Sequence, residues 1–308
     1  MSKTAHIFPG QGSQYVGMAK GLYERFEEVK EIYHTANELL EFDLTKICFQ
    51  GPKEELRQTR VTQPAIFVHS AVLTKLLRKK GVEPSMTAGH SLGEYSALFA
   101  AGALTFEDAL SLVKIRAELM QKAGDIKPGT MAAIIGLDVQ AVQNVCDEAS
   151  SAGVVQVANF NSPIQVVISG SVGGVNKAIE MAKNHGAKKA IPLVVSGAFH
   201  SPLMEYALEG LGKALSEIKI NAASIPVYAN LDAQPTSTPD EIKQKLRAQL
   251  TSPVQWTEII ENMIEDGATQ FHEIGPGSVL TGLLKRINKR VAGKTIDNLE
   301  SLENINRG

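Results

Sequence analysis

The chain has 308 residues, a length that corresponds to about two domains or to one large domain carrying an insertion. Its hydrophobic content of 44% is normal for a globular protein and argues against a disordered, collagen-like or disulfide-scaffold protein. The 31 basic and 33 acidic side chains leave a formal charge of −2, so we expect no nucleic-acid partner.

The two cysteines, Cys48 and Cys146, form no CxxC pair and lie beside no cluster of histidines. We therefore expect both to be small core residues, and we expect no metal site. The N-terminal residues lack the apolar run of a signal peptide, and no stretch reaches the ~18 apolar residues of a membrane span. These features predict a cytoplasmic protein with no membrane contact.

The N-terminal third of the chain predicts alternating strands and helices. Residues 5–8 form an apolar run, a Pro-Gly-Gln-Gly turn follows, and apolar side chains from Tyr15 to Val29 recur at helical spacing. We expect a strand, a tight loop and one helix there. Residues 64–80 predict a further helix, and 85–89 predict a short strand on the weak support of two strand-favouring residues.

The middle of the chain predicts a separate small unit in the order βαββαβ, which is typical of a ferredoxin-like domain. Its expected strands cover residues 131–137, 154–158, 165–169 and 190–195, and its helices 139–149 and 175–184. Alternation then resumes, with strands over 225–229 and 270–274 and helices over 203–217, 241–250 and 279–287. The sequence thus predicts an α/β fold: a large domain with a parallel sheet from residues 1–124 and 197–308, interrupted by a domain over 125–196.

The sharpest chemical signal is the G-x-S-x-G motif at residues 89–93, which lies between a predicted strand and a helix-prone segment. At such a turn the flanking glycines avoid backbone collisions and expose the serine hydroxyl. Ser91 is therefore a candidate nucleophile, and the Leu92 N–H at the helix N-terminus could stabilise an oxyanion. The alternative is an ordinary glycine-flanked serine in a loop.

A nucleophilic serine needs a base, and His200 is the best placed of the seven histidines. It ends a strand-to-loop segment and follows Ser91 in the chain order of α/β-hydrolases. His272, just before a glycine turn, is the second choice, and His200 could also be a capping or surface residue. No Asp or Glu between Ser91 and His200 stands at a strand end, so a backbone carbonyl could orient the imidazole instead.

Arg116 falls on the apolar face of a helix predicted over residues 106–122. A guanidinium cannot lose its proton there, so it requires an anion, and its fork suits a carboxylate. Two interpretations remain open: a structural ion pair with an acidic residue, or a substrate carboxylate held near Ser91.

Gly10 and Gly12 follow the first predicted strand and could belong to a dinucleotide-binding loop, but Tyr15 occupies the place of the third glycine. Gln11, at the carboxyl end of that strand, is better placed to donate to an oxyanion. The glycine turn at residues 275–277 is more typical of a structural loop.

Seven motifs in chain order make the sequence resemble the malonyl-CoA:acyl carrier protein transacylase family along nearly its whole length. They are residues 8–14 (Phe-Pro-Gly-Gln-Gly-Ser-Gln), 62–64 (Thr-Gln-Pro), 89–94 (Gly-His-Ser-Leu-Gly-Glu), Arg116, 197–200 (Gly-Ala-Phe-His), 252–256 (Ser-Pro-Val-Gln-Trp) and 275–277 (Gly-Pro-Gly).

The resemblance implies an α/β-hydrolase-like large domain with a ferredoxin-like insertion. It also implies a ping-pong malonyl transfer from malonyl-CoA to the phosphopantetheine thiol of acyl carrier protein for fatty acid synthesis, with no cofactor. The implied roles are nucleophile for Ser91, base for His200, carboxylate partner for Arg116, oxyanion hole for Gln11 with the Leu92 N–H, histidine-orienting carbonyl for Gln249, and pocket lining for Gln63, Asn159 and Phe199. Nothing in the sequence demands more than a monomer.

Two other functions share some of these features. A serine esterase or thioesterase would use Ser91 and His200 but deacylate with water, and Arg116 on an apolar face argues mildly against it. A non-catalytic nucleotide-binding or scaffold protein would instead use Gly10 and Gly12.

Overall fold

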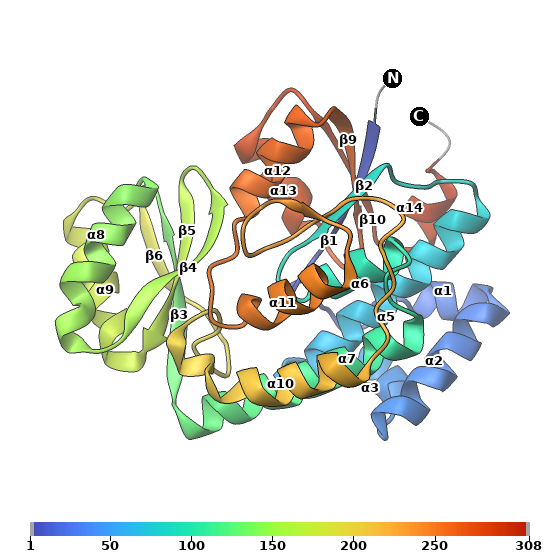
Figure 1. Ribbon diagram of the computed structural model, residues 1–308, viewed down its shortest axis with the longest axis horizontal. Helices are drawn as coiled ribbons and strands as arrows, with labels where there is room; N and C mark the ends of the chain where they lie inside the picture. Colours follow the sequence, from blue (N-terminus) through green and yellow to red (C-terminus); the bar gives the residue numbers. More distant parts are fainter. Residues whose placement is uncertain (1–2, 306–308) are drawn as a thin grey trace.

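The computed structural model describes residues 3–305 and contains two β-sheets that lie beside each other (Figure 1). The strands are β1 (Lys3–Phe8), β2 (Met86–Gly89), β3 (Gly129–Ile135), β4 (Val155–Ser162), β5 (Gln165–Ser171), β6 (Lys189–Pro192), β7 (Val227–Tyr228), β8 (Pro235–Thr236), β9 (Ala268–Ile274) and β10 (Ala292–Ile296).

Helices cover both faces of the larger sheet and one face of the smaller sheet. The α-helices are α1 (Lys20–Arg25), α2 (Glu27–Leu40), α3 (Leu44–Gln50), α4 (Lys53–Leu56), α5 (Thr59–Lys79), α6 (Gly93–Ala100), α7 (Phe106–Ile126), α8 (Val139–Ala149), α9 (Val172–Asn184), α10 (Tyr206–Glu217), α11 (Pro239–Gln249), α12 (Trp256–Glu265), α13 (Val279–Ile287) and α14 (Leu299–Glu303). Two short 3₁₀ turns cover Ser150–Ala152 and Pro202–Met204.

The larger sheet has the strand order β10-β9-β1-β2-β7-β8, and all its pairs are parallel except β7 with β8. Side chains of β1 alternate between two cores. Phe8 packs with helices α2, α5, α6 and α7 on one face, and Ile7 packs with α12 and α13 on the other. Because both faces are covered by helices, the strands are buried on both sides, as parallel sheets require. The predicted α/β fold with a parallel sheet is confirmed.

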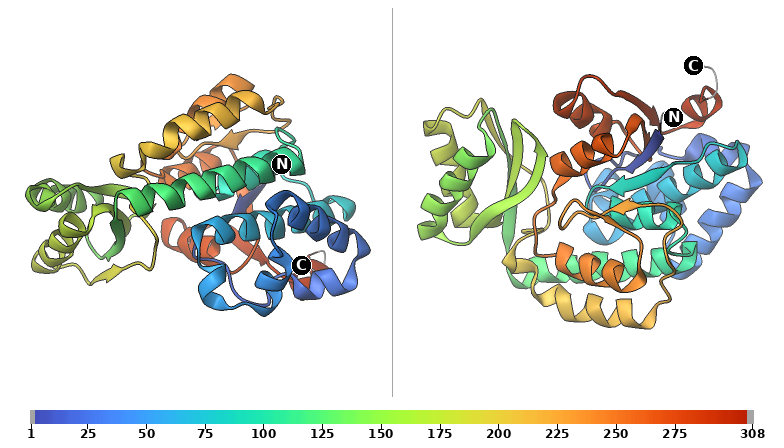
Figure 2. Two further views of the ribbon diagram at one scale, coloured as in Figure 1. Left: turned by 90° about the horizontal axis from the view of Figure 1, so that it is seen from below. Right: turned by 45° about the horizontal axis from the view of Figure 1, so that its top comes forward.

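The smaller sheet is antiparallel and has the strand order β4-β5-β3-β6. Its elements follow in the predicted order βαββαβ. Ala132 and Ile134 face α8 and α9, whereas Met131 and Ala133 face the core of the larger part. We propose residues 125–196 as the limits of an inserted domain, although α7 runs two residues past the lower limit, to Ile126 (Figure 2, left).

A short backbone ladder joins the two parts of the molecule. Asn159 of β4 pairs with Val254, which follows α11, and the Val254 N–H donates to the Ala158 carbonyl oxygen at 2.8 Å. The Phe160 N–H donates back to the Val254 carbonyl oxygen at 2.9 Å. The end of α11 and strand β4 are therefore held in a fixed relation.

The single helix predicted from Tyr15 to Val29 is wrong. Gly17 and Ala19 have positive φ angles of 98° and 63°, and Phe26 is extended with φ −121° and ψ 123°. The chain forms turns up to residue 19, and then two helices, α1 and α2, separated at Phe26. The apolar spacing continues across this break because Met18, Leu22, Phe26 and Val29 all pack on one core, so periodicity alone could not reveal it.

Several other elements also differ from the predictions. Helix α5 begins at Thr59 rather than at residue 64, because Pro64 lies inside the helix and not at its start. Strand β6 ends at Pro192; the Leu193 N–H still donates to the Met131 carbonyl oxygen of β3 at 2.9 Å, and the chain leaves the sheet after it. The edge strand β10 was not expected from its sequence, Ala-Gly-Lys-Thr-Ile, in which few residues favour a strand.

Cys48 and Cys146 are free and buried, in agreement with the expectation that they are core residues. Burial raises the pKa of both thiols. Among residues 3–305, no helix is both long and apolar enough to cross a bilayer, and no group of histidine, cysteine and acidic side chains has the arrangement of a metal site.

His6 of β1 makes the stability of the fold depend on pH. It is 1% exposed and neither ring nitrogen has a hydrogen-bond partner. Burial, followed by the nearby His272 and Arg78, lowers its pKa from 6.5 to about 3. The folded state therefore keeps this ring neutral while the unfolded chain takes up a proton, so stability present above pH 6.5 is lost as the pH falls toward 3. At about pH 5 the loss from this group is about 2 kcal/mol.

We expect His6→Phe to remove this contribution. Between about pH 7.5 and pH 5, the free energy of unfolding should fall by about 2 kcal/mol less in the variant than in the native chain, as measured by urea denaturation. The exposed His185 provides the control, because His185→Gln should follow the native chain. An equal fall in His6→Phe and the native chain would contradict the argument.

Candidate active site

Two loops meet at the carboxyl edge of the larger sheet. Phe8, the last residue of β1, lies opposite Gly89, the last residue of β2, and the His90 N–H donates to the Phe8 carbonyl oxygen at 2.9 Å. Ligands in open α/β sheets bind outside this edge. The loop that carries Gln11 and the turn that carries Ser91 are therefore neighbours because their strands are paired.

Glycines on both sides of Ser91 are required by close backbone contacts. A Cβ atom at Gly89 would lie 1.9 Å from the Gly93 backbone, and one at Gly93 would lie 2.1 Å from the Phe8 carbonyl oxygen. Ser91 itself has a positive φ of 51°, an unfavourable conformation for a residue with a side chain. This strained turn between β2 and α6 presents the serine hydroxyl to the space above the sheet.

Ser91 and His200 are in contact. The Ser91 Oγ lies 2.8 Å from Nε2 of His200, although 109 residues separate them in the chain. His200 Nδ1 lies 2.9 Å from the backbone carbonyl oxygen of Gln249, the group that the family resemblance implies for this position. Because a carbonyl oxygen only accepts, Nδ1 carries the hydrogen, and Nε2 is left free to accept the serine proton.

The imidazole of His200 is held in its neutral form. Burial, together with the positive charge of Arg116, lowers the His200 pKa from 6.5 to about 3. His200 also has a positive φ of 57°, so Ser91 and His200 both occupy left-handed backbone conformations. A neutral imidazole with a bonded Nδ1–H can act as a general base toward the serine at any ordinary pH.

Arg116 of α7 lies directly beside the serine. Its guanidinium is 1% exposed and donates to Gln63 Oε1 at 2.7 Å, to Gln249 Oε1 at 2.8 Å and to Ser91 Oγ at 3.0 Å. Within residues 3–305, no carboxylate lies within ion-pair distance of it. The guanidinium is thus surrounded by neutral acceptors, and the structural ion pair considered from the sequence is not present there.

The sequence reasoning assigned no role to Glu94 or Asn230, and both support the site. Asn230 Oδ1 accepts from the Ser91 N–H at 2.6 Å, and its side-chain nitrogen donates to the Gly89 carbonyl oxygen at 2.7 Å. One oxygen of Glu94 accepts from the Asn230 N–H at 3.1 Å and from Gln249 Nε2 at 2.7 Å. Burial raises the Glu94 pKa to about 7. Asn230 follows β7 at the same sheet edge, which is the signal that could have identified it.

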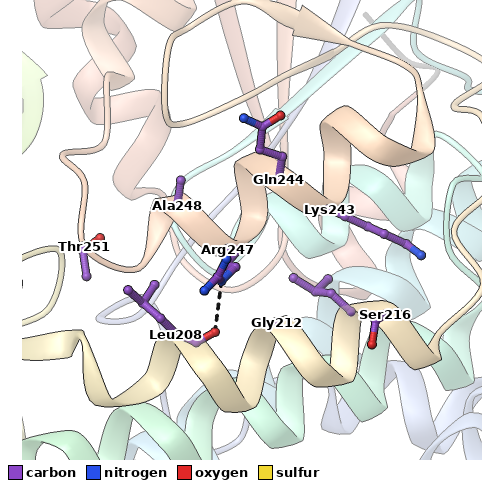
Figure 3. Close-up of a pocket in the computed structure, with 9 residues that line it drawn as sticks. Leu208, Gly212, Ser216, Lys243, Gln244, Arg247, Ala248 and Thr251 are labelled. Carbon is purple, nitrogen blue, oxygen red and sulfur yellow. Dashed lines mark hydrogen bonds between the residues drawn. The ribbon is translucent and has the colours of Figure 1, made fainter.

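The side chain of Gln249 joins several of these groups. Besides accepting from Arg116, it donates to the Ser91 carbonyl oxygen at 3.1 Å. Its position depends on α11, which packs beside α10 and leaves a groove of about 610 Å³ between them, where Arg247 Nε donates to the Leu208 carbonyl oxygen at 3.3 Å (Figure 3). No residue lines both this groove and the cavity around Ser91.

A cavity of about 100 Å³ opens beside Ser91. Most of the site residues expected from the sequence line it, together with residues that the sequence did not single out: Gln11, Gln63, His90, Leu92, Arg116, Met120, Met131, Asn159, Leu193, Val195, Phe199 and His200. The space beside Ser91 can hold a small acyl group.

The two expected oxyanion donors reach this cavity from different loops. The Leu92 N–H lies at the start of α6, and it has no backbone acceptor within the described chain. Gln11 places its side-chain nitrogen 3.4 Å from Thr59 Oγ1. His272, the second-choice base, lies elsewhere: it is paired with His6 between β9 and β1 and does not line the cavity.

Comparison with known proteins agrees with this geometry. A family model described as the acyl transferase domain matches residues 5–304. The chain is 47% identical over 304 residues to a malonyl CoA-acyl carrier protein transacylase of Bacillus subtilis, covering 98% of this chain and 96% of the relative. A relative of the same name from Haemophilus influenzae is 46% identical over 93% of each chain.

Solved structures show the same fold. A crystal structure of an acyl carrier protein S-malonyltransferase from Vibrio cholerae has a TM-score of 0.95 and 45% identity, and covers 99% of this chain and 100% of that one. A complex described as a type II PKS acyl-carrier protein with its malonyl-transacylase has a TM-score of 0.95 and 41% identity, with 98% of each chain covered.

The fold, the family match and the paired serine and histidine define an acyltransferase. Within this class, the chain belongs to the malonyl CoA-acyl carrier protein transacylase family, as its sequence motifs indicated.

The state of His200 leads to a prediction for Ser91 labelling. We expect phenylmethanesulfonyl fluoride to modify Ser91 at a rate that changes little between about pH 7 and pH 5, because a base with a pKa near 3 stays neutral. A histidine of ordinary pKa would slow the reaction about 20-fold over this range. Intact-mass spectrometry measures the rate.

Two variants test which histidine acts. His200→Ala should slow the labelling at least about 100-fold, whereas His272→Ala should leave it unchanged. A clear inflection near pH 6.5 in the native enzyme, or equal effects of the two variants, would contradict the assignment.

Proposed function

We propose that this enzyme transfers the malonyl group of malonyl-CoA to the phosphopantetheine thiol of acyl carrier protein, through a malonyl-serine intermediate at Ser91. The relatives that carry the transacylase name support the substrates, and the complex with a carrier protein supports the acceptor. The product, malonyl-acyl carrier protein, would supply fatty acid synthesis.

The observation that carries the choice of substrate is the buried cation next to the nucleophile. Arg116 Nη2 lies 3.0 Å from Ser91 Oγ and faces a cavity large enough for a small acyl group. A malonyl group bound to this serine would place its free carboxylate beside the guanidinium, which otherwise has only neutral acceptors. Charge-assisted hydrogen bonds of this kind are about twice as strong as neutral ones.

The first half-reaction begins with proton transfer. Ser91 gives its hydroxyl proton to His200 Nε2 as Oγ bonds to the thioester carbonyl carbon. The Gln249 carbonyl stabilises the resulting imidazolium through the Nδ1–H. The carbon–sulfur bond then breaks, and the departing thiolate of coenzyme A takes the proton from His200. Malonyl-Ser91 and neutral His200 remain.

The negative charge on the carbonyl oxygen requires donors that are already in place. The Leu92 N–H at the start of α6 is one, and Gln11 is the other. Their positions are fixed by the paired ends of β1 and β2, so little reorganisation is needed as the charge develops.

The second half-reaction repeats these steps with another thiol. The phosphopantetheine thiol of acyl carrier protein gives its proton to His200 and attacks the malonyl ester, and the proton then returns to Ser91. The residues named here supply every acid, base and donor in this scheme, so we propose a monomeric enzyme that uses no cofactor.

Three further residues shape the acyl site in this proposal. Gln63 holds the guanidinium of Arg116 from the side opposite to Gln249. Asn159 and the buried Phe199 line the cavity. Phe199 leaves little room for a branch on the acyl chain, so it would favour malonyl over branched groups.

Brief exposure to malonyl-CoA should load one malonyl group onto the native chain, as intact-mass spectrometry would show, and peptide mapping should place it on Ser91. Ser91→Ala should take up none and should lose transfer activity while keeping its melting temperature. The adduct should persist without a thiol acceptor. Rapid hydrolysis would favour the esterase alternative, and no labelling would favour a non-catalytic protein.

Arg116→Ala should selectively reduce malonyl transfer. Loss of a hydrogen-bonded charge pair costs about 1.5–3 kcal/mol, so the ratio of kcat/KM for malonyl-CoA to that for acetyl-CoA should fall about 10- to 100-fold. Arg116→Lys keeps the charge without the fork and should give an intermediate ratio. An unchanged ratio in Arg116→Ala would remove the role assigned to this residue.

A further inference from the structure

A second cavity adjoins the one around Ser91. The two share Gln11, Leu193 and Val195 in their linings, and the second has a volume of about 430 Å³. It lies between the loop after β1, the α4 region and residues 193–195, the segment that leaves strand β6. This cavity, which we call the outer cleft, is lined by Gln11, Gly12, Gln14, Tyr15, Lys53, Leu56, Arg57, Leu193, Val194 and Val195.

The cavity beside Ser91 has a volume of about 100 Å³ and the outer cleft about 430 Å³, so most of a thioester substrate would extend from the first into the second. Hydrogen bonds span the junction between the two. Thr59 Oγ1 lies 2.7 Å from Ser196 Oγ and accepts from Gln11 Nε2 at 3.4 Å, which ties the first loop, α5 and the segment after β6 together. A volume of about 430 Å³ is in the range of ordinary ligand sites.

The walls of the outer cleft suit an amphipathic chain. Leu193 and Val195 supply apolar surface, and Val194 is 87% exposed, an unusual state for a branched apolar side chain. The amide side chains of Gln11 and Gln14 offer polar groups along the same cleft. A pantetheine arm has this alternation, since it carries two amides and a dimethyl carbon.

Two cations line the same cleft. Lys53 and Arg57 are exposed, and in the described chain neither makes an ion pair with a carboxylate. The carboxylate of Asp297 is bonded to the Tyr15 hydroxyl at 2.9 Å, on a neighbouring part of the lining. Lysine and arginine without acidic partners are suited to a phosphate.

We propose that the outer cleft binds the pantetheine arm of the thioester and that Lys53 and Arg57 hold the phosphate at its end. This inference rests on the proposed function, because it assumes a pantetheine thioester as substrate. Coenzyme A and the carrier protein's prosthetic group share this phosphate, so one site serves the leaving thiol and the incoming thiol in turn.

Protection of Ser91 from phenylmethanesulfonyl fluoride tests the proposal with coenzyme A, 4′-phosphopantetheine and phosphate-free pantetheine as ligands. In Lys53→Ala and Arg57→Ala, the concentration for half protection should rise about fivefold for coenzyme A and for phosphopantetheine, as expected for the loss of one charge-assisted contact. It should not change for pantetheine. Arg60→Ala is the matched control, because Arg60 is an exposed arginine outside the cleft.

Three results would overturn the proposal: equal weakening of all three ligands, no difference between Arg57→Ala and Arg60→Ala, or weakening of coenzyme A alone, which would place the cations on its nucleotide part. The native enzyme's transfer of malonyl from malonyl-CoA is measured separately. Failure of that transfer would reject the proposed function, whereas the protection results reject or support the phosphate site.

Discussion

The whole site depends on burying a positive charge beside a serine hydroxyl. A guanidinium removed from water is costly unless its donors are satisfied, and Arg116 meets this requirement only in part. Its Nη1 and Nη2 atoms donate to two amide oxygens and Ser91 Oγ, whereas the buried Nε has no hydrogen-bond partner in the described chain. Its direct acceptors are neutral, and the acidic group that acts on it, Glu94, is a buried carboxyl whose own pKa is raised to about 7. The polar groups around Arg116 therefore have to hold this cation in place without a bonded carboxylate.

Gln249 provides much of that rigidity because its backbone and its side chain act on different partners. The carbonyl oxygen orients His200, while the side-chain amide accepts from Arg116 and donates to Glu94 and Ser91. His200, Arg116 and Ser91 are thus all hydrogen-bonded to a single residue at the end of α11. A shift of that helix would disturb all three at once.

Much of the fold could be predicted from the sequence, because the strand and helix periodicities of this chain are clear. The break at Phe26 could not, since it depends on backbone angles that leave the apolar spacing intact. Two features of the site could be recognised from short stretches of sequence: the glycines on both sides of Ser91, and the charge of Arg116 on the apolar face of its helix. Glu94, Asn230 and the Gln249 side chain come from three segments that are distant in the chain. No local sequence pattern therefore predicts the hydrogen bonds between them.

The order in which the segments occur along the chain has a consequence for synthesis at the ribosome. Ser91 is synthesised early, but the carbonyl that accepts from His200 Nδ1 belongs to residue 249, and the loop that pairs with β4 follows at Val254. A nascent chain that has emerged only as far as His200 lacks the group that orients this imidazole. The arrangement around Ser91 can therefore be completed only after about four fifths of the polypeptide has been translated.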